Sequence, residues 1–400
     1  MRAALLLLLV AGCATPEDPG GACAPADLEP LSATPAYAVV ASDYSSSAVG
    51  LLDASGGVIT EAWLDSGSAP PGVVAALSGD VSLPSAPLDR CTLAVLDRFG
   101  TDVLTLLDTC SQVPVRTQVD VGAGFSANPH DVLRVDGGLW VSRYDVNASA
   151  EPTSIERGND VAIVEGGRVV ARIDLSLGDA GEAFARPNRM AWLEGPGGHR
   201  RVVVGLARLS TDFMVAAAGA VAVIDPETRA AELVELEGLA QCGELDALGD
   251  RLLVTCTGAP FAGEEARRDT AGVVALALDA DGAVVTAAEW RAADHPGEPV
   301  PSGPTVPLDA ERWVTVAWGD VFDDVPDRVL LLRPGADAEV LFTAPPFTIG
   351  EGAYDPAADL LLLPDAGAGT VRRLRADGTE LDPVTVTTCH GLPPREIARL

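Results

Sequence analysis

The chain has 400 residues, 48% of them hydrophobic, which is enough to build a large buried core. Its formal charge is −31, and all 27 basic residues are arginine. A body this acidic repels phosphate backbones, so the composition argues against nucleic-acid binding and favours cationic partners.

The first residues of the chain, MRAALLLLLVAGC, have the pattern of an export signal. Arg2 precedes an apolar run that is too short to span a bilayer, for which ~20 apolar residues are needed. Ala11 and Gly12 stand directly before Cys13, which resembles the lipobox of bacterial lipoproteins. The resemblance implies a signal peptide over 1–12, acylation of Cys13 and anchoring by lipid in the cell envelope. An ordinary signal peptide with an incidental cysteine is the alternative.

A segment rich in Pro, Gly, Ala and acids follows. Residues 13–35 show no core pattern and are expected to form the lipidated N-terminus and a flexible tether. Ala14 stands where an aspartate would resemble the inner-membrane retention signal, which favours the outer membrane and leaves periplasmic or surface exposure open. We expect the folded body to span residues 36–390 and residues 391–400 to form a C-terminal tail.

One unit, made of a short apolar strand, a turn and a second strand, recurs seven times along the body. The first strand and turn of each unit occupy 47–57, 91–101, 159–168, 219–229, 273–282, 327–337 and 369–379. Another strand precedes each hairpin, and a fourth segment precedes most of these. The sequence therefore predicts an all-β fold, a β-propeller with seven blades of four antiparallel strands. An eight-bladed ring and two packed sheets are the alternatives, since the first unit lacks an obvious innermost strand.

The outer hairpins resemble those of bacterial YVTN/lactonase-like propellers. GAVAVIDPETRAAELVEL (219–236) and DVAIVEGGRVVARIDL (160–175) match the hairpin pattern of that class best. The likeness covers roughly residues 36–388 and implies the propeller fold. The likeness does not indicate what the protein does, because proteins with one fold can have many different activities.

The chain has seven cysteines, and six remain if Cys13 carries lipid. An even number in an exported protein predicts disulfides, with six buried free thiols as the alternative. Two pairs flank hairpin turns, which would bring them opposite each other on paired strands. The predicted pairs are Cys91 with Cys110, Cys242 with Cys256, and Cys23 with Cys389. The last pair, or residues near Cys389 that complete the first blade, would close the ring.

The strands of a meander turn alternately at two edges, and these edges differ in the sequence. One edge has short turns, such as 135–138 and 249–250. The other edge has the longer loops, at 65–77, 120–129, 144–159, 176–187, 210–219, 257–271, 291–303 and 319–327. Long loops on a rigid scaffold usually carry binding residues, so we expect the functional site on that edge, around the central channel.

Polar residues recur where the innermost strands begin at the long-loop edge. We expect a ligand-binding cluster at the channel mouth, formed by Asn128, His130, Asp131, Arg186, Asn188, Arg189, Glu244 and Glu351. Such a cluster suits a small polar ligand, a cation or acid–base chemistry. The alternative is that these side chains only seal the ring as satisfied polar groups.

Metal and catalytic motifs are weak in this chain. An acidic loop formed by Asp320, Asp323, Asp324 and Asp327 could bind Ca²⁺. It lacks the spacing of an EF-hand, so a solvated loop is favoured and no metal or other cofactor is predicted. The sequence holds no GxSxG, HExxH or P-loop motif.

Two functions fit these observations. The favoured hypothesis is a non-catalytic lipoprotein of the cell envelope that binds a protein partner through its long-loop face, including 144–159 and 257–271. The alternative is a lactonase-like propeller hydrolase with His130, Arg189 and Glu244 at the channel mouth. The missing catalytic motifs favour binding over catalysis.

Overall fold

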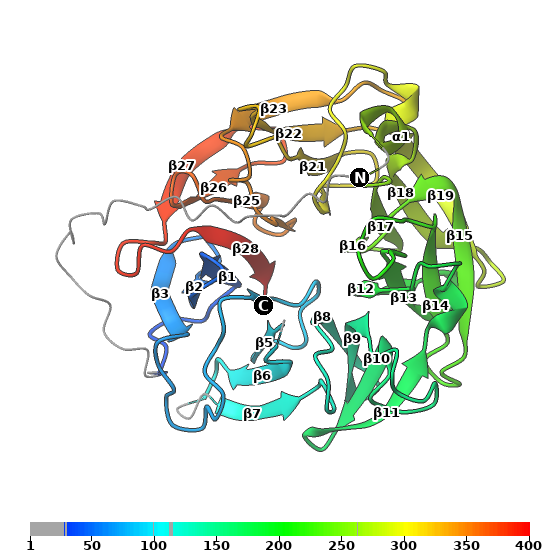
Figure 1. The fold of residues 1–400 in the computed structure, drawn as a ribbon. Coiled ribbons are helices and arrows are strands. Elements are labelled where there is room, and N and C mark those ends of the chain that lie inside the picture. The colour runs from blue at the N-terminus through cyan, green and yellow to red at the C-terminus, as the bar shows by residue number, and fades with distance from the viewer. Residues whose placement is uncertain (1–27, 29, 99, 112–114, 262) are drawn as a thin grey trace.

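The computed structural model describes residues 28, 30–98, 100–111, 115–261 and 263–400. They form a ring of seven blades around a central channel (Figure 1). The seven blades of four antiparallel strands confirm the fold predicted from the repeats, and the eight-bladed and two-sheet alternatives are wrong.

Each blade is one antiparallel sheet whose strands follow one another from the centre of the ring to its rim. Blade 1 comprises β28 (Pro394–Arg399), β1 (Tyr37–Ser42), β2 (Ser47–Leu52) and β3 (Val58–Asp65). Blade 2 comprises β4 (Val81–Ser82), β5 (Thr92–Asp97), β6 (Val103–Asp108) and β7 (Val115–Asp120). Blade 3 comprises β8 (Pro129–Val135), β9 (Gly138–Val146), β10 (Gly158–Glu165) and β11 (Arg168–Asp174).

The other four blades repeat this order. Blade 4 comprises β12 (Pro187–Glu194), β13 (Arg200–Leu206), β14 (Ala218–Ile224) and β15 (Ala231–Ala240). Blade 5 comprises β16 (Glu244–Leu248), β17 (Arg251–Thr257), β18 (Ala271–Leu278) and β19 (Val284–Arg291). Blade 6 comprises β20 (Thr305–Pro307), β21 (Trp313–Ala317), β22 (Asp327–Leu332) and β23 (Glu339–Ala344). Blade 7 comprises β24 (Ala353–Asp355), β25 (Leu360–Asp365), β26 (Thr370–Leu374) and β27 (Glu380–Thr385).

The core lies between adjacent blades. Every residue of the middle strands β2 and β5 is buried, whereas the outermost strand β3 is half-exposed. One apolar cluster unites blades 4 and 5, with Val203 and Val221 packed in the same cluster as Leu252. Burying each Val or Leu side chain contributes about 1.5–3 kcal/mol, so stacked apolar sheets hold the ring together. This stacking explains why the strands read as near-continuous apolar runs.

The last strand of the chain closes the ring. β28 pairs antiparallel with β1, with Val39 opposite Ile397, and forms the innermost strand of blade 1. The expected boundary, with residues 391–400 as a tail outside the propeller, is therefore wrong, and the propeller extends to Arg399. The segment PREIAR gives no strand signal of its own, because its partner strand lies at the opposite end of the chain.

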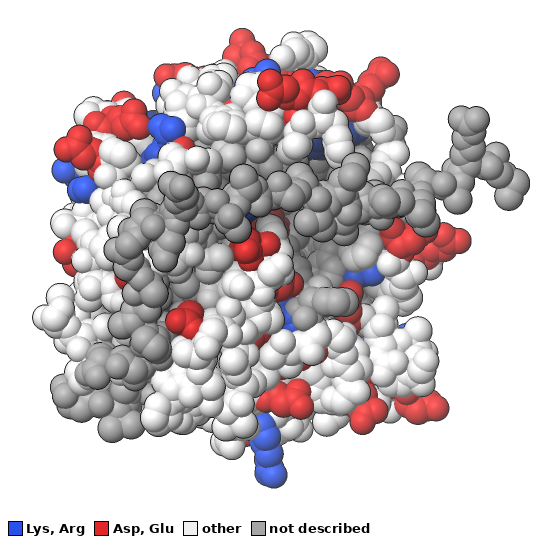
Figure 2. Space-filling model, turned by 60° about the vertical axis from the view of Figure 1, so that its left-hand side comes forward, with Lys and Arg blue, Asp and Glu red and all other residues white. Residues whose placement is uncertain are grey.

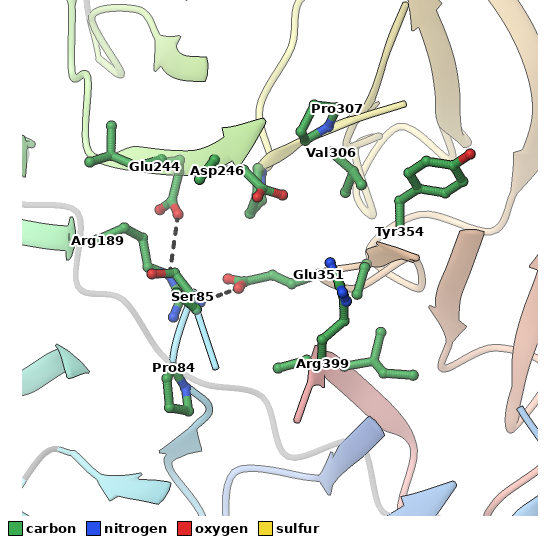
Figure 3. A pocket seen from close by; sticks show the side chains of 18 of the residues that line it. Pro84, Ser85, Arg189, Glu244, Asp246, Val306, Pro307, Glu351, Tyr354 and Arg399 are labelled. Carbon is green, nitrogen blue, oxygen red and sulfur yellow. Dashed lines mark hydrogen bonds and ion pairs between the residues drawn. The ribbon is translucent and has the colours of Figure 1, made fainter. Parts of the chain in front are cut away.

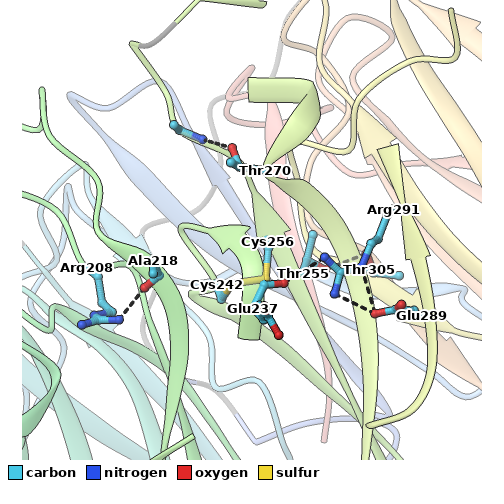
Figure 4. Close-up of a disulfide and its surroundings, with 11 residues drawn as sticks. Arg208, Ala218, Glu237, Cys242, Thr255, Cys256, Thr270, Glu289, Arg291 and Thr305 are labelled. Atoms are coloured by element: carbon cyan, nitrogen blue, oxygen red, sulfur yellow. Dashed lines mark hydrogen bonds and ion pairs between the residues drawn. A yellow bond between two sulfur atoms is a disulfide. The ribbon is translucent and has the colours of Figure 1, made fainter. Parts of the chain in front are cut away.

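Two hairpin disulfides are present as predicted. Cys91 is bonded to Cys110, with a Cα–Cα distance of 5.4 Å, and Cys242, just before the innermost strand of blade 5, is bonded to Cys256 of β17 (Figure 4). Cys389 is also in a disulfide, while its predicted partner Cys23 lies outside the described residues. Disulfides of this kind are typical of proteins outside the cytoplasm. The signal peptide 1–12, Cys13 and most of the tether likewise fall outside the described residues.

Helices are short and lie in the connections. They are α1 (Glu264–Asp269) and the 3-10 turns η1 (Ser176–Gly178), η2 (Pro196–Gly198) and η3 (Ala292–Asp294). Within the described part of the chain, no helix combines the length and the apolar character needed to cross a membrane.

The two edges of the ring differ as the sequence predicted. All innermost strands begin at one edge, which we call the long-loop edge, and end at the other, the short-turn edge. The eight long loops predicted from the sequence all lie at the long-loop edge. One long connection, residues 83–91 between β4 and β5, lies at the short-turn edge instead.

Candidate functional site

Three innermost strands are preceded by a residue in the left-handed region. Asn128, Arg186 and Gln241 have φ angles of 51°, 49° and 55°. Few residues other than glycine adopt this conformation, so its repetition at equivalent positions marks a shared turn into the channel. The residues three positions further on are Asp131, Arg189 and Glu244.

His130, Asn188 and Glu244 form a hydrogen-bonded row across blades 3, 4 and 5. His130 Nδ1 lies 2.6 Å from Asn188 Oδ1, and Asn188 Nδ2 donates to Glu244 Oε1 at 2.7 Å. Because the amide oxygen accepts, His130 carries its proton on Nδ1. The His130 ring also stacks on Tyr144 at a centroid distance of 4.3 Å. Gly243 allows this packing, since a Cβ there would lie 2.9 Å from Asn188 Nδ2.

Arg189 lies at the centre of the ring and joins blade 4 to four other blades. Its Nη2 forms ion pairs with Glu351 and with Glu396, the latter at 3.0 Å, and its Nε lies 3.7 Å from Glu244 Oε2. Its Nη1 donates to the carbonyl of Leu83 at 2.8 Å. The Arg189 side chain is only 7% exposed. We call Arg189, Glu244, Glu351 and Glu396 the Arg189 cluster.

The backbone of the closing strand positions two of these glutamates. Glu351 N donates to Arg395 O at 2.9 Å, and Ile397 N donates to Glu351 O at 2.9 Å. Ser82 Oγ donates to Glu396 Oε1 at 3.2 Å. The cluster therefore forms only when β28 closes the ring beside blade 7.

Asp131 has a structural role. Its buried carboxylate accepts hydrogen bonds from Ser85 Oγ and from the backbone amides of Ser85, Val132 and Met190, at 2.5–3.0 Å. These donors come from blades 2, 3 and 4, so Asp131 ties three blades together. With its oxygens occupied, this carboxylate is poorly placed to bind a ligand.

Two other predicted site residues lie at the long-loop edge, outside the Arg189 cluster. Arg186 Nη1 pairs with Asp145 Oδ1 at 2.6 Å, and its guanidinium contacts the rings of Tyr144 and Phe213. Asn128 accepts a backbone hydrogen bond from Tyr144 N at 3.1 Å within its turn. The structure thus brings together His130, Asn188, Arg189, Glu244 and Glu351, and gives Asn128, Asp131 and Arg186 other surroundings.

The low-dielectric centre of the ring perturbs its titratable groups. Burial, and then the charge of Glu351, raises the pKa of both Glu244 and Glu396 to about 7. Burial, and then the charge of Arg98, lowers the pKa of His130 to about 3. Burial disfavours the charge of Arg189, but the surrounding glutamates outweigh it and raise the pKa of its guanidinium.

A cavity of about 280 Å³ lies against the Arg189 cluster. It extends from Arg189, Glu244 and Glu351 to residues at the short-turn ends of the innermost strands, including Asp246 and Arg399 (Figure 3). The cavity is therefore on the opposite side of the cluster from the loops where a site was expected.

Two acidic residues at the cavity, Asp246 and Glu396, were not predicted from the sequence. Asp246 follows Glu244 by two residues in β16, so the period of a strand could have placed both side chains on the channel face. Glu396 gave no such signal, because it lies in the segment interpreted as a tail. Burial raises the pKa of Asp246 to about 7.

Metal binding finds little support in the described residues. The one group of possible ligands within reach of a single ion there is Cys91, Cys110 and Asp108, and the two cysteines are joined in a disulfide. In the acidic loop, Asp327 accepts four backbone hydrogen bonds, including those from Gly319 and Ile349. The acidic loop is therefore a hydrogen-bonded turn in the structure.

Most of the exposed large apolar side chains lie at one edge of the ring. Fifteen large hydrophobic side chains of the described residues are exposed, and four of these, all valines, lie in outermost strands. The other eleven all lie in connections of the long-loop edge, namely Tyr44, Val74, Ile155, Leu177, Phe213, Met214, Val215, Phe261, Val321, Phe322 and Phe347. Isolated exposed apolar residues are common, but their segregation to one edge is not.

Comparison with known proteins identifies the fold. No family model and no curated protein match the sequence. Among solved structures, the chain is similar to the periplasmic gluconolactonase of Pseudomonas aeruginosa, with a TM-score of 0.55, 15% identity, and 92% and 99% of the two chains covered. It is also similar to a hypothetical selenium-binding protein from Sulfolobus tokodaii, with a TM-score of 0.53, 11% identity, and coverage of 94% and 97%. A third similar structure is a functionally unknown protein from Desulfotomaculum acetoxidans, with a TM-score of 0.51, 11% identity, and coverage of 91% and 98%.

These likenesses agree with the seven-bladed propeller of the structure, and at such low identity they show the fold alone.

Proposed function

We propose that the protein is a non-catalytic binding protein of the cell envelope that holds a protein partner on its long-loop edge. The observation that supports this proposal is the segregation of exposed apolar side chains to that edge. Phe322 is 98% exposed and Val74 is 92% exposed, which no requirement of folding explains. Large aromatic anchors are the side chains that contribute most to protein–protein binding.

The charge around these side chains suggests the chemistry of the partner. Phe322 lies between Asp320 and the pair Asp323 and Asp324, and Phe322 N donates to Asp320 Oδ1 at 2.7 Å. Acidic side chains outnumber basic ones over the side of the molecule seen in Figure 2. Apolar anchors ringed by carboxylates complement a protein segment that carries both apolar and cationic side chains.

The same charge argues against an anionic lipid surface as the partner of this edge. Carboxylates beside an apolar tip are repelled by anionic headgroups, which attract basic residues instead. Phe213, Met214 and Val215 follow Asp212 directly, so a second apolar tip carries the same acidic flank.

The hydrolase hypothesis receives less support from the geometry. A general base works best when its pKa lies near the working pH, and burial lowers the pKa of His130 to about 3. Its Nδ1 proton is also engaged by Asn188. Glu244 has a suitable pKa, but its Oε1 accepts from Asn188 and its Oε2 faces Arg189. The structural likeness to a gluconolactonase carries the fold only.

Partner binding can be tested with matched surface variants. The full-length protein would be used to recover partners from solubilised envelopes, with each recovered protein quantified by mass spectrometry. Phe322→Ser and Phe213→Ser should each lower recovery of one partner about tenfold, as loss of an aromatic anchor does. Val285→Ser is the control, because Val285 is 40% exposed on the outermost strand β19. Equal recovery with all three variants would contradict the proposal.

We also propose that Cys13 carries lipid and anchors the protein in the outer membrane. The support is the sequence around Cys13 and the disulfides, which indicate an extracytoplasmic location. Metabolic labelling with an alkyne fatty acid should mark the wild-type protein, and Cys13→Ser should abolish the label. Labelling that survives this substitution would exclude Cys13 as the site.

A further inference from the structure

We propose that the cavity beside the Arg189 cluster is a binding site for a small organic cation, an amine with an apolar body. The cavity reaches the short-turn ends of the innermost strands, whereas the proposed partner surface lies on the long-loop edge. The two sites are therefore separate, and either can exist without the other.

The cavity is built from six blades and is closed on one side. Its lining comes from the innermost strands of blades 1, 4, 5, 6 and 7 and from the 83–91 connection of blade 2. The Arg189 cluster forms the inner wall. A volume of about 280 Å³ accepts a small molecule, near the lower end of the range for ligand pockets.

Negative charge dominates the cavity. Its lining carries the carboxylates of Glu244, Asp246, Glu351 and Glu396 against the guanidinium groups of Arg189 and Arg399. Arg189 pairs with Glu351 and Glu396. No ion pair reaches Asp246 from any described residue, and its carboxylate points into the cavity in Figure 3.

A second, independent feature points to a ligand that donates a hydrogen bond. Glu244 Oε2 is buried without a hydrogen-bond partner in the described structure, and its nearest cationic atom, Arg189 Nε, is 3.7 Å away. A buried carboxylate oxygen without a hydrogen bond is costly, because burial removes its water and nothing replaces it. An ammonium group bound in the cavity would supply a donor to Glu244 Oε2 and a counter-charge to Asp246.

The opposite wall of the cavity is apolar. Val306 and Pro307 of β20 line it, on the other side of Asp246 from Glu244, and beside them lies Tyr354 of β24, whose ring points away from the cavity (Figure 3). The Tyr354 hydroxyl donates to Asp359 Oδ1 at 3.2 Å, which fixes the ring. Such a wall suits the hydrocarbon part of an amine.

A metal ion fits this cavity less well than an amine. Among the described residues, no set of three carboxylates here comes within reach of one ion. Arg189 already lies between the glutamates. Hard divalent ions require several oxygens at once, whereas an ammonium needs two or three acceptors with wider spacing.

Calorimetry with the full-length protein tests this assignment. The probes are benzylamine, its uncharged analogue benzyl alcohol, 1,4-diaminobutane and CaCl₂, each at pH 8. We expect at least one amine to bind and benzyl alcohol to bind about tenfold more weakly or not at all. Asp246→Asn should weaken amine binding about tenfold, while Asp281→Asn, an exposed turn residue at the same edge, should leave it unchanged.

The pH dependence adds a readout that a structural effect of Asp246→Asn would not produce. Burial raises the pKa of Asp246 to about 7, so amine binding should weaken as the pH falls from 8 to 6 while the amine stays charged. The groups facing Asp246 in the cavity are Glu244, Glu351, Glu396, Arg189 and Arg399. Binding of Ca²⁺ alone, equal binding of benzyl alcohol, or no amine binding at millimolar concentration would each overturn the proposal.

Discussion

Replacing Arg189 with methionine would remove the cation that compensates three glutamates at the centre of the ring. The Arg189 side chain is 7% exposed, and those of Glu396, Glu244 and Glu351 are 11%, 22% and 32% exposed. Removing one partner of a buried ion pair costs ~3–5 kcal/mol. Because the glutamates retain some contact with solvent, we expect a loss near the lower end, about 3 kcal/mol at pH 8.

Thermal unfolding measures this loss. The unfolding entropy of a chain of this size makes ~1 kcal/mol equivalent to about 1.3 °C, so Arg189→Met should lower Tm by about 4 °C at pH 8. The deficit should shrink as the pH falls toward 4.5, because protonation then removes the uncompensated negative charge from the folded variant. Adding Glu351→Gln and Glu396→Gln to the variant should restore most of the stability.

A surface ion pair supplies the control for this experiment. Arg200 pairs with Glu194 at 3.0 Å, with both side chains about half-exposed, and Arg200→Met should cost less than about 1 kcal/mol. A change in Tm below 1 °C for Arg189→Met at pH 8, or a deficit that is the same at pH 5, would refute this account of the cluster.

Three further predictions follow from the closure, the disulfides and the buried glutamates. Deleting residues 394–400 should abolish the single cooperative unfolding transition in calorimetry, because β1 loses the strand paired with its inner edge. An unchanged transition would contradict this role of β28. Replacing Cys91 and Cys110 by serine should cost about 3 kcal/mol, measured by urea unfolding against the oxidised protein, whereas a loss below ~1 kcal/mol would contradict the loop-closure reasoning. Folding raises the pKa of Glu396 from 4.5 to about 7, so the free energy of unfolding of the wild type falls as the pH rises from 4.5 to 7. The stability of Glu396→Gln relative to wild type should therefore rise across this range, and a constant difference would exclude the raised pKa.

Much of the fold could be predicted because its signals are local. Each blade is a meander, so apolar runs separated by turns report its strands directly. The same local register placed Cys91 opposite Cys110 and Cys242 opposite Cys256. The closing strand could not be predicted in this way, since Pro394–Arg399 finds its partner only in the first strand of the propeller.

The sequence repeat predicts which polar residues of successive blades lie near one another in the candidate site. The first residues of three successive innermost strands bring His130, Asn188 and Glu244 into one row. The repeat does not show which polar group is already satisfied by another blade. The Asp131 carboxylate accepts hydrogen bonds from donors in blades 2 and 4, and this arrangement depends on the 83–91 connection folding inward.

The position of the cavity also depends on contacts between distant segments. The Arg189 cluster divides the centre of the ring, and its assembly requires Glu351 beside blade 7 and Glu396 from the closing strand of blade 1. Loop length alone predicts a functional site on the long-loop edge, where we propose that the partner binds. Loop length does not predict the cavity. The cavity lies beyond the cluster, toward the short-turn ends of the innermost strands.

Site-specific photo-crosslinking tests the central claim, that the long-loop edge holds a protein partner. A photoreactive phenylalanine would replace Phe322 on the long-loop edge in one strain and Asp281 on the short-turn edge in another. Irradiation of intact cells should give a crosslink to one envelope protein from position 322 and none from position 281. Equal crosslinks from both positions, or none from position 322 at normal expression, would contradict the claim.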